Sequence, residues 1–241
     1  MYLVVMMELS VVIPAYNEEQ RILPTVKKIH SLLSKQKHDF EIIVVDDGST
    51  DRTKQVVEEL GLAFTRVVRQ PGNTGKGAAV QRGIMESVKE WILFSDADLS
   101  TPIEELGKFL SLTKEADIII GSRNLKGSKI QVKQPFLRSS LGKAFPKIVS
   151  LILTMPIKDT QCGFKLFHKR TKHLFSPLLT KGYAFDVEVL YKAMLSGYRI
   201  KEVPVIWRND GRSKVSPLRD SLRMLRDIIR IKLRVKKDNS C

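Results

Sequence analysis

Five short apolar runs, rich in valine and isoleucine, recur through the first half of this 241-residue sequence and constrain its fold more than any other feature. Each run has the length of a buried strand and is too short for a typical helix. The runs are Leu9–Ile13, Glu41–Val45, Phe64–Val68, Trp91–Ser95 and Asp117–Gly121. Since buried strands need covering on both faces, the intervening segments should be helices.

Those intervening segments do have helical patterns. The first should carry Pro24 in its first turn, and the second should follow a cap at Ser49 or Thr50. A third helix is expected at Ala78–Val88. Strands alternating with helices predict an α/β fold with a mostly parallel central sheet, whose ligands bind beyond the carboxyl ends of the strands. The residues expected to face the sheet are Ile22, Val26, Ile29 and Leu33, then Val56, Val57 and Leu60.

The second half begins with a basic loop and continues with an apolar helix near Phe136–Ile157 and a strand at Val203–Trp207. One domain is expected over residues 1–215, followed by a basic amphipathic helix and tail over 216–241. In that helix, leucines and an isoleucine form one stripe and arginines an adjoining one. The helix could lie in a lipid headgroup plane or pack on its own domain. The stripes are Leu218, Leu222, Leu225 and Ile229, and Arg219, Arg223, Arg226 and Arg230.

The charge balance is strongly basic: 41 Lys and Arg face 26 Asp and Glu, a formal net charge of +15. This favours an anionic partner, such as nucleic acid, anionic lipid or a phosphorylated substrate. Two cysteines predict no disulfide framework, so a cytoplasmic location is expected. Met1–Met7 lacks the pattern of a signal peptide. The uncharged stretch Ile148–Ile157 is half of the roughly 20 residues that span a membrane, so attachment should be peripheral.

Two aspartates one residue apart, Asp96 and Asp98, follow the Trp91–Ser95 run. Carboxylates at a strand end can bind a hard divalent cation on a diphosphate. The alternative is that one of them caps the next helix. The downstream residues Thr101 and Glu104 already form a capping box, which would leave both aspartates without a structural role.

Two other strand ends could hold a nucleotide. At the end of the second strand, Asp46 or Asp47 could accept hydrogen bonds from a base or ribose, or the two acids could belong to a capped turn. Tyr16 could lie against a nucleoside, or be a packing residue. The glycine-rich segment Gly72–Gly77 lacks the spacing of a Walker loop and is expected to be a loop over the donor. Within it, Lys76 could face a phosphate or solvent.

Taken in order, these segments resemble glycosyltransferase family 2, with its GT-A fold, and within it the dolichyl-phosphate mannose and dolichyl-phosphate glucose synthases. The resemblance runs from about residue 8 to residue 215. The matching segments are VVIPAYNEE, VVDDGSTD, GNTGKGAAV, FSDADLS, GSRNLKG, DTQCGFKLF, GYAFDVE and GRSK.

The resemblance implies roles for individual residues. Asp98 would be the principal ligand of a Mg or Mn ion, with Asp96 beside it. Catalytic roles are expected for Asp96, Asp98 and Asp186. The donor-binding residues implied are Pro14, Ala15, Tyr16, Glu18, Val45, Asp47, Lys76, Asp96 and Ala97. The phosphate- or acceptor-binding residues implied are Arg123, Arg138, Arg208, Ser213 and Lys214.

The resemblance also implies a reaction, namely transfer of a hexose with inversion from a nucleotide-sugar donor to dolichyl or polyprenyl phosphate at the cytoplasmic membrane surface. Ser100 stands where mannose synthases often carry glutamine, so a third metal ligand from this turn is not expected. The later segments DTQCGFK and YAFDVE resemble the glucose branch, which favours UDP-glucose over GDP-mannose. A lipid phosphate needs no general base, which would make Asp186 an orienting residue; with a sugar hydroxyl acceptor it would be the base. The alternatives are a family 2 enzyme acting on a glycan hydroxyl and a basic nucleic-acid-binding module. The latter leaves the strand-end acids unexplained.

Overall fold

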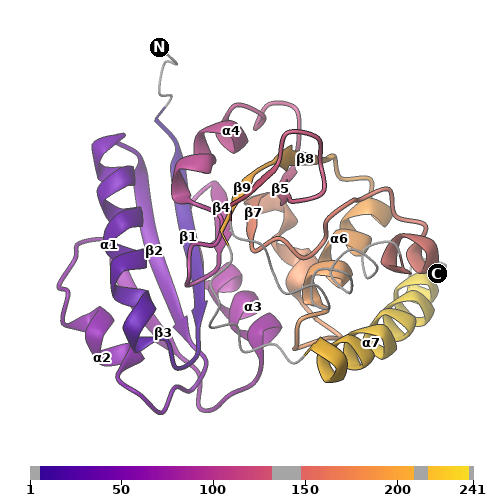
Figure 1. The fold of residues 1–241 in the computed structure, drawn as a ribbon, viewed down its shortest axis with the longest axis horizontal. Coiled ribbons are helices and arrows are strands. Elements are labelled where there is room, and N and C mark those ends of the chain that lie inside the picture. The colour runs from indigo at the N-terminus through magenta and orange to yellow at the C-terminus, as the bar shows by residue number, and fades with distance from the viewer. Residues whose placement is uncertain (1–5, 132–147, 209–216, 239–241) are drawn as a thin grey trace.

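The computed structural model describes residues 6–131, 148–208 and 217–238 (Figure 1). Arg138, Ser213 and Lys214 therefore lie outside the described residues. The strands are β1 (Glu8–Ala15), β2 (Asp39–Asp46), β3 (Thr65–Arg69), β4 (Trp91–Ser95), β5 (Ile118–Ser122), β6 (Lys129–Ile130), β7 (Phe164–His168), β8 (Ile200–Pro204) and β9 (Ile206–Trp207). The helices are α1 (Glu19–Lys35), α2 (Thr53–Glu58), α3 (Lys76–Glu86), α4 (Leu106–Leu110), α6 (Phe185–Leu195) and α7 (Pro217–Asp238), with 3₁₀ turns η1 (Ile103–Glu105) and η2 (Lys169–Phe175).

A seven-stranded sheet in the order β3-β2-β1-β4-β7-β5-β8 forms the centre of the molecule. Strands β1 to β4 pair in parallel, and so do β5 and β8, whereas β7 runs antiparallel between β4 and β5. This confirms the predicted α/β fold with a mostly parallel sheet. The five apolar runs are strands to within two residues at either end. Strand β7 and helix α6 were not predicted.

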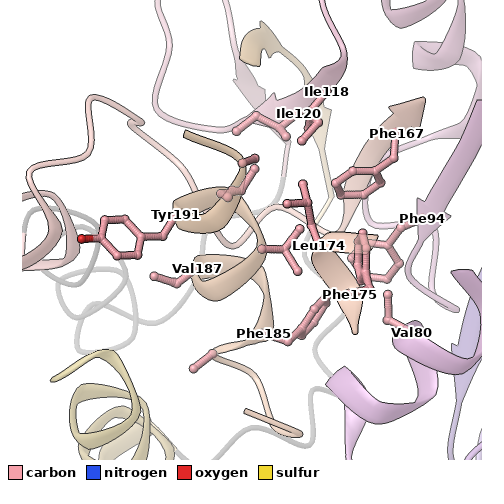
Figure 2. Close-up of a cluster of buried hydrophobic side chains, with 14 of the residues drawn as sticks. Val80, Phe94, Ile118, Ile120, Phe167, Leu174, Phe175, Phe185, Val187 and Tyr191 are labelled. Carbon is pink, nitrogen blue, oxygen red and sulfur yellow. The ribbon is translucent and has the colours of Figure 1, made fainter. Parts of the chain in front are cut away.

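Helices cover both faces of the sheet. On one face, α1 packs against alternate residues of β1 and β2, as its apolar stripe predicted: Ile22, Val26, Ile29 and Leu33 are all fully buried. On the other face, α3, α6 and α7 enclose a second core. Figure 2 shows the centre of that core, where Phe94 of β4 and Phe185 of α6 meet edge to face with ring centroids 5.7 Å apart. Gly83 lets α3 lie close against the sheet, because any residue with a Cβ at this position would overlap the Val12 side chain of β1.

Several details differ from the sequence predictions. Pro24 lies inside α1, six residues along a helix that begins at Glu19, and not in its first turn. Helix α2 begins at Thr53, so neither Ser49 nor Thr50 caps it. Both residues instead hold the end of β1: Ser49 Oγ accepts a hydrogen bond from the Asn17 amide, and the Thr50 amide donates to Asn17 Oδ1.

The predicted strand at Val203–Trp207 is two strands. Strand β8 ends at Pro204, and β9 pairs with β6 outside the main sheet. Of the helix predicted at Phe136–Ile157, residues 148–157 are described: 148–153 are helical, but the helix ends there, and Thr154 has a φ of 53°. Val149 and Leu153 are buried in the second core, whereas Leu151 is 84% exposed.

Helix α7 packs against α6 (Figure 1). The residues it buries are Met224, Ile228, Ile231 and Val235. Of the stripe predicted from the sequence, Leu222 and Ile229 face outward, at 70% and 48% exposed, whereas Leu225 is partly buried and the Leu218 side chain lies outside the described ones. Leu233, at 69% exposed, extends this outward face. The helix is therefore apolar on two faces, and one of them covers the domain. Along the described part of the chain, no helix is long and apolar enough to cross a bilayer.

Candidate active site

The two aspartates predicted to bind a metal lie in a tight turn directly after β4, at the carboxyl end of the sheet. The turn is held from three sides. The Asp96 amide donates to Gly163 O at 3.0 Å, Thr25 Oγ1 of α1 donates to Ala97 O at 2.7 Å, and the Arg208 amide donates to Ser100 O at 2.7 Å. A turn fixed in this way presents its carboxylates in one geometry, as ligand binding requires.

The predicted capping box does not form. Helix η1 begins after Pro102 and no side chain caps it. Glu104 reaches Lys28 of α1 at 3.0 Å instead. Asp98 has the structural role that the sequence did not predict, since its Oδ1 accepts a hydrogen bond from the Ser100 amide at 2.9 Å.

Two lysine–aspartate pairs adjoin the turn. Lys76, the first residue of α3, lies with its Nζ 2.7 Å from Asp96 Oδ1. Lys165 of β7 is fully buried and donates to Asp186 Oδ1 of α6 at 2.6 Å. The two ammonium groups lie over the Phe94 ring, each 5.5 Å from its centroid. Two positive and two negative groups therefore surround one aromatic ring.

These charges shift one another's pKa. Burial raises the pKa of Asp98, and the nearby Asp96 carboxylate raises it further. Burial likewise raises the pKa of Asp186, although Lys165 opposes the shift. For Lys76, burial alone would lower the pKa, but Asp96 and Asp186 outweigh it and the net shift is upward. The corner is thus one where extra positive charge near Asp98 would be favourable.

Asp96 and Asp98 fit a divalent cation in part. They are oxygen donors, the type that Mg²⁺ and Mn²⁺ prefer, and their mutual repulsion would be relieved by a cation. Among the described residues, however, no three His, Cys, Asp or Glu side chains gather in a metal-binding cluster. A cation held here would need further ligands from water or from the phosphates of a donor.

The residues predicted to hold a nucleoside lie at the neighbouring ends of β1 and β2. Pro14 is in register with Val45, and Ala15 with Asp46. Glu18 pairs with Arg21 through two hydrogen bonds of 2.6 Å. The structure thus brings these predicted residues to one edge of the sheet, together with Ala97 in the adjoining turn.

Asp47 already has several hydrogen-bond partners. Its Oδ1 accepts from the amide and hydroxyl of Thr74 and from Gln70, and its Oδ2 accepts from the Gly75 amide. Gly48, at a φ of 71°, lets the chain pass against Gly72, where a Cβ would lie 2.5 Å from the backbone. Asp47 therefore ties the loop before Lys76 to the end of β2.

The predicted phosphate-binding arginines are also paired. Arg123 donates from Nε and Nη2 to the two oxygens of the buried Asp159, at 2.7 and 2.9 Å. Burial would raise the pKa of Asp159, but the guanidinium outweighs it and the net shift is downward. Arg208 is exposed and its Nε donates to Gln131 at 2.6 Å.

Three residues of this site were not singled out in the sequence: Asp159, Gly163 and Lys165. Gly163 leaves the space that the Asp96 carboxylate occupies, since a Cβ there would overlap it. All three lie in the segment DTQCGFK, which carried part of the family resemblance. A lysine inside an apolar run was the available signal, because an unpaired lysine is almost never fully buried.

Comparison with known proteins places this site in a family. Residues 10–175 match the family model of glycosyl transferase family 2. The chain is 38% identical to a dolichyl-phosphate beta-glucosyltransferase of Dictyostelium discoideum, over 94% of this chain and 74% of that protein. It is 37% identical to the dolichyl-phosphate beta-glucosyltransferase of Homo sapiens, over 94% of this chain and 75% of that protein.

Solved structures share the fold. Mannosyl-3-phosphoglycerate synthase from Rubrobacter xylanophilus matches with a TM-score of 0.72 at 20% identity, covering 96% of this chain and 75% of that one. Glucosyl-3-phosphoglycerate synthase from Mycobacterium tuberculosis, in complex with UDP, matches with a TM-score of 0.65 at 25% identity, covering 94% and 79%.

Proposed function

Because this chain belongs to glycosyltransferase family 2, we propose that it is a transferase that moves glucose from UDP-glucose to dolichyl or polyprenyl phosphate. That the chain is a glycosyltransferase follows from the family. The proposal goes further in naming the sugar and the acceptor. Both are supported by relatives that align along nine-tenths of this chain and are named dolichyl-phosphate beta-glucosyltransferase. GDP-mannose is the alternative donor to UDP-glucose in this proposal.

The observation that carries the proposal is the acid turn after β4, with Lys76 against it. An anionic diphosphate leaving group requires positive charge where its own charge develops. Lys76 could supply part of that charge, and a Mg or Mn ion held by Asp98 and Asp96 would supply the rest as a Lewis acid. We infer that Pro14, Ala15, Tyr16, Glu18, Val45, Asp47 and Ala97 hold the nucleoside.

In the proposed reaction, an oxygen of the acceptor phosphate forms a bond to the anomeric carbon while the bond from that carbon to the diphosphate breaks. The electron pair of the broken bond leaves with UDP, and the configuration inverts. The acceptor oxygen is already an anion near neutral pH, so no residue has to remove a proton from it. Asp186, held by Lys165, then orients the site. Arg123 and Arg208 would face phosphate groups of donor or acceptor.

We further propose that the enzyme works at a membrane surface, using the outward face of α7. There Leu222, Ile229 and Leu233 follow one another at steps of seven and four residues, so they share a face of the helix. The exposed Arg226 and Arg230 adjoin this face. Leucines beside arginines suit the headgroup region of an anionic leaflet, where each basic residue contributes about 1 kcal/mol. The separate unit predicted at residues 216–241 would be this attachment element.

A donor and acceptor screen tests the proposal. Purified protein with Mn²⁺ is offered UDP-glucose, GDP-mannose or UDP-N-acetylglucosamine, each with and without a polyprenyl phosphate, and the glycolipid is measured by mass spectrometry. Glucolipid formed only from UDP-glucose is the expected result, and Asp98→Ala should abolish it. Glucose transfer to a soluble glycan without any lipid phosphate would instead favour a family 2 enzyme of polysaccharide synthesis.

A further inference from the structure

The carboxylate of Asp96 has a cationic partner within the protein. The Lys76 ammonium lies 2.7 Å from Asp96 Oδ1, and the two side chains are 27% and 28% exposed. Asp96 lies in the same turn as Asp98, and Lys76 reaches this turn from the start of α3, in the corner where the proposed function places a divalent cation. An ammonium and a divalent cation cannot both lie against one carboxylate without repelling each other.

The backbone around Lys76 is held in place. Gly75, at a φ of 105°, lies so close to the next loop that a Cβ would stand 2.5 Å from Lys181 O. The Gly75 amide is bonded to Asp47, and the Ala78 amide donates to Lys181 O at 3.2 Å. The base of the side chain is therefore fixed, and the long flexible side chain is the part that can move its charge.

Four charged groups near Lys76 already offset one another without a metal, and Asp98 adds one further carboxylate to the corner. Lys76 and Lys165 offset Asp96 and Asp186, so the group of four carries no net charge. A divalent cation at Asp96 would add two positive charges beside the Lys76 ammonium. The diphosphate of a bound nucleotide would bring negative oxygens that can take over the ammonium.

We propose that Lys76 competes with the divalent cation for Asp96, so that the cation binds tightly only together with the nucleotide diphosphate. This inference rests on the proposed function, because it takes Asp96 as a metal ligand. Lys76 leaves Asp96 when the phosphates arrive and so couples the two binding events. By thermodynamic linkage, the cation then strengthens nucleotide binding by the same factor as the nucleotide strengthens cation binding.

The test measures Mn²⁺ binding and needs no turnover. Free Mn²⁺ is followed by electron paramagnetic resonance during titration of the wild-type protein, with and without saturating UDP. The same titrations are made on Lys76→Met and Lys76→Gln, and on Lys76→Arg, which keeps the charge. Lys89→Met is the matched control, because it removes a lysine that pairs at 2.6 Å with Asp39, the first residue of β2, at the opposite end of the sheet.

Wild-type protein should bind Mn²⁺ weakly alone and more tightly with UDP. In Lys76→Met and Lys76→Gln, Mn²⁺ should bind without UDP roughly 5- to 100-fold more tightly than in the wild type, and UDP should add less. Lys76→Arg and Lys89→Met should resemble the wild type. Thermal melting establishes that each variant is folded. Because Lys76→Met and Lys76→Gln differ in shape and polarity, an effect seen in both comes from the loss of the charge.

The failures are distinguishable. If the wild type binds Mn²⁺ with UDP but the neutral variants show the same affinities and the same UDP effect, the competition by Lys76 is refuted while the metal site stands. If the neutral variants bind Mn²⁺ more tightly than the wild type by the same factor with and without UDP, Lys76 acts only as a nearby positive charge. The proposed coupling between Mn²⁺ and UDP binding is then refuted. If no protein binds Mn²⁺ even with UDP, the metal assignment and this inference both fall.

Discussion

Replacing Gly163 by alanine tests whether the position of one carboxylate governs activity. The new methyl group would overlap the Asp96 carboxylate, and even Oδ1 would lie only 2.7 Å away. Oδ2 and Cγ would lie closer still, so to reach the usual carbon contact distance of 3.5–4.0 Å the carboxylate must retreat by about 2 Å. Gly163 needs no left-handed backbone conformation, so the substitution acts through this overlap.

A misplacement of only about 1 Å in a catalytic geometry can already lower the rate by about 100-fold. We therefore expect Gly163→Ala to lose at least about 100-fold in kcat, with a stability cost of about 1–3 kcal/mol for the extra methyl group. Steady-state transfer kinetics and chemical denaturation measure the two effects. Gly107→Ala in α4 is the control, because an added Cβ there meets nothing within 4 Å. A folded Gly163→Ala protein with wild-type kcat would refute the role given to Asp96.

Three further predictions concern other parts of the chain. Arg123→Met leaves the buried Asp159 unpaired and should lower the free energy of unfolding by about 3–5 kcal/mol at pH 7. The pKa of Asp159 is shifted downward in the folded protein, so this contribution is complete above the unfolded pKa of about 3.9 and declines as the pH falls towards the folded pKa. Chemical denaturation should therefore show a larger wild-type advantage at pH 7 than at pH 3. Asp186→Asn should slow transfer to a lipid phosphate modestly and transfer to a sugar hydroxyl drastically, so assays with both acceptors identify which is natural. Changing Leu222 and Leu233 of α7 to serine should reduce flotation with anionic vesicles at low salt while leaving UDP binding intact; unchanged flotation would exclude this face as the contact.

The elements that could be predicted were those whose apolar residues are regularly spaced. The stripe from Ile22 to Leu33 identified α1 because each member faces one sheet, and β4 was predicted to its last residue. Strand β7 was missed because Lys165 interrupts its apolar run. That lysine is buried with two partners, the Cys162 carbonyl and the Asp186 carboxylate, and the charged partner belongs to α6, a later element of the chain. Local pattern cannot reveal a partner that only the folded chain supplies.

Helix α7 was predicted, but Leu222 and Ile229 of the stripe assigned to it lie on the outward face. Both of its apolar faces are compatible with the sequence, and only contact with α6 selects Met224 and Ile228 for burial. In the candidate site, Asp96 and Asp98 could be found from their place after a strand. Their partners could not, because Gly163 and Lys76 reach the turn through the tertiary structure.

The antiparallel strand β7 also fixes the order in which the sheet can be completed during synthesis. Strand β5 contacts the β1–β4 half of the sheet only through β7, which is made about forty residues later. Until then, the isoleucines at 118–120 have no neighbouring strand in the growing chain, because β8 comes later still. A nascent chain paused between β5 and β7 would expose an apolar edge, and this is the interval in which chaperone capture or aggregation should be most frequent.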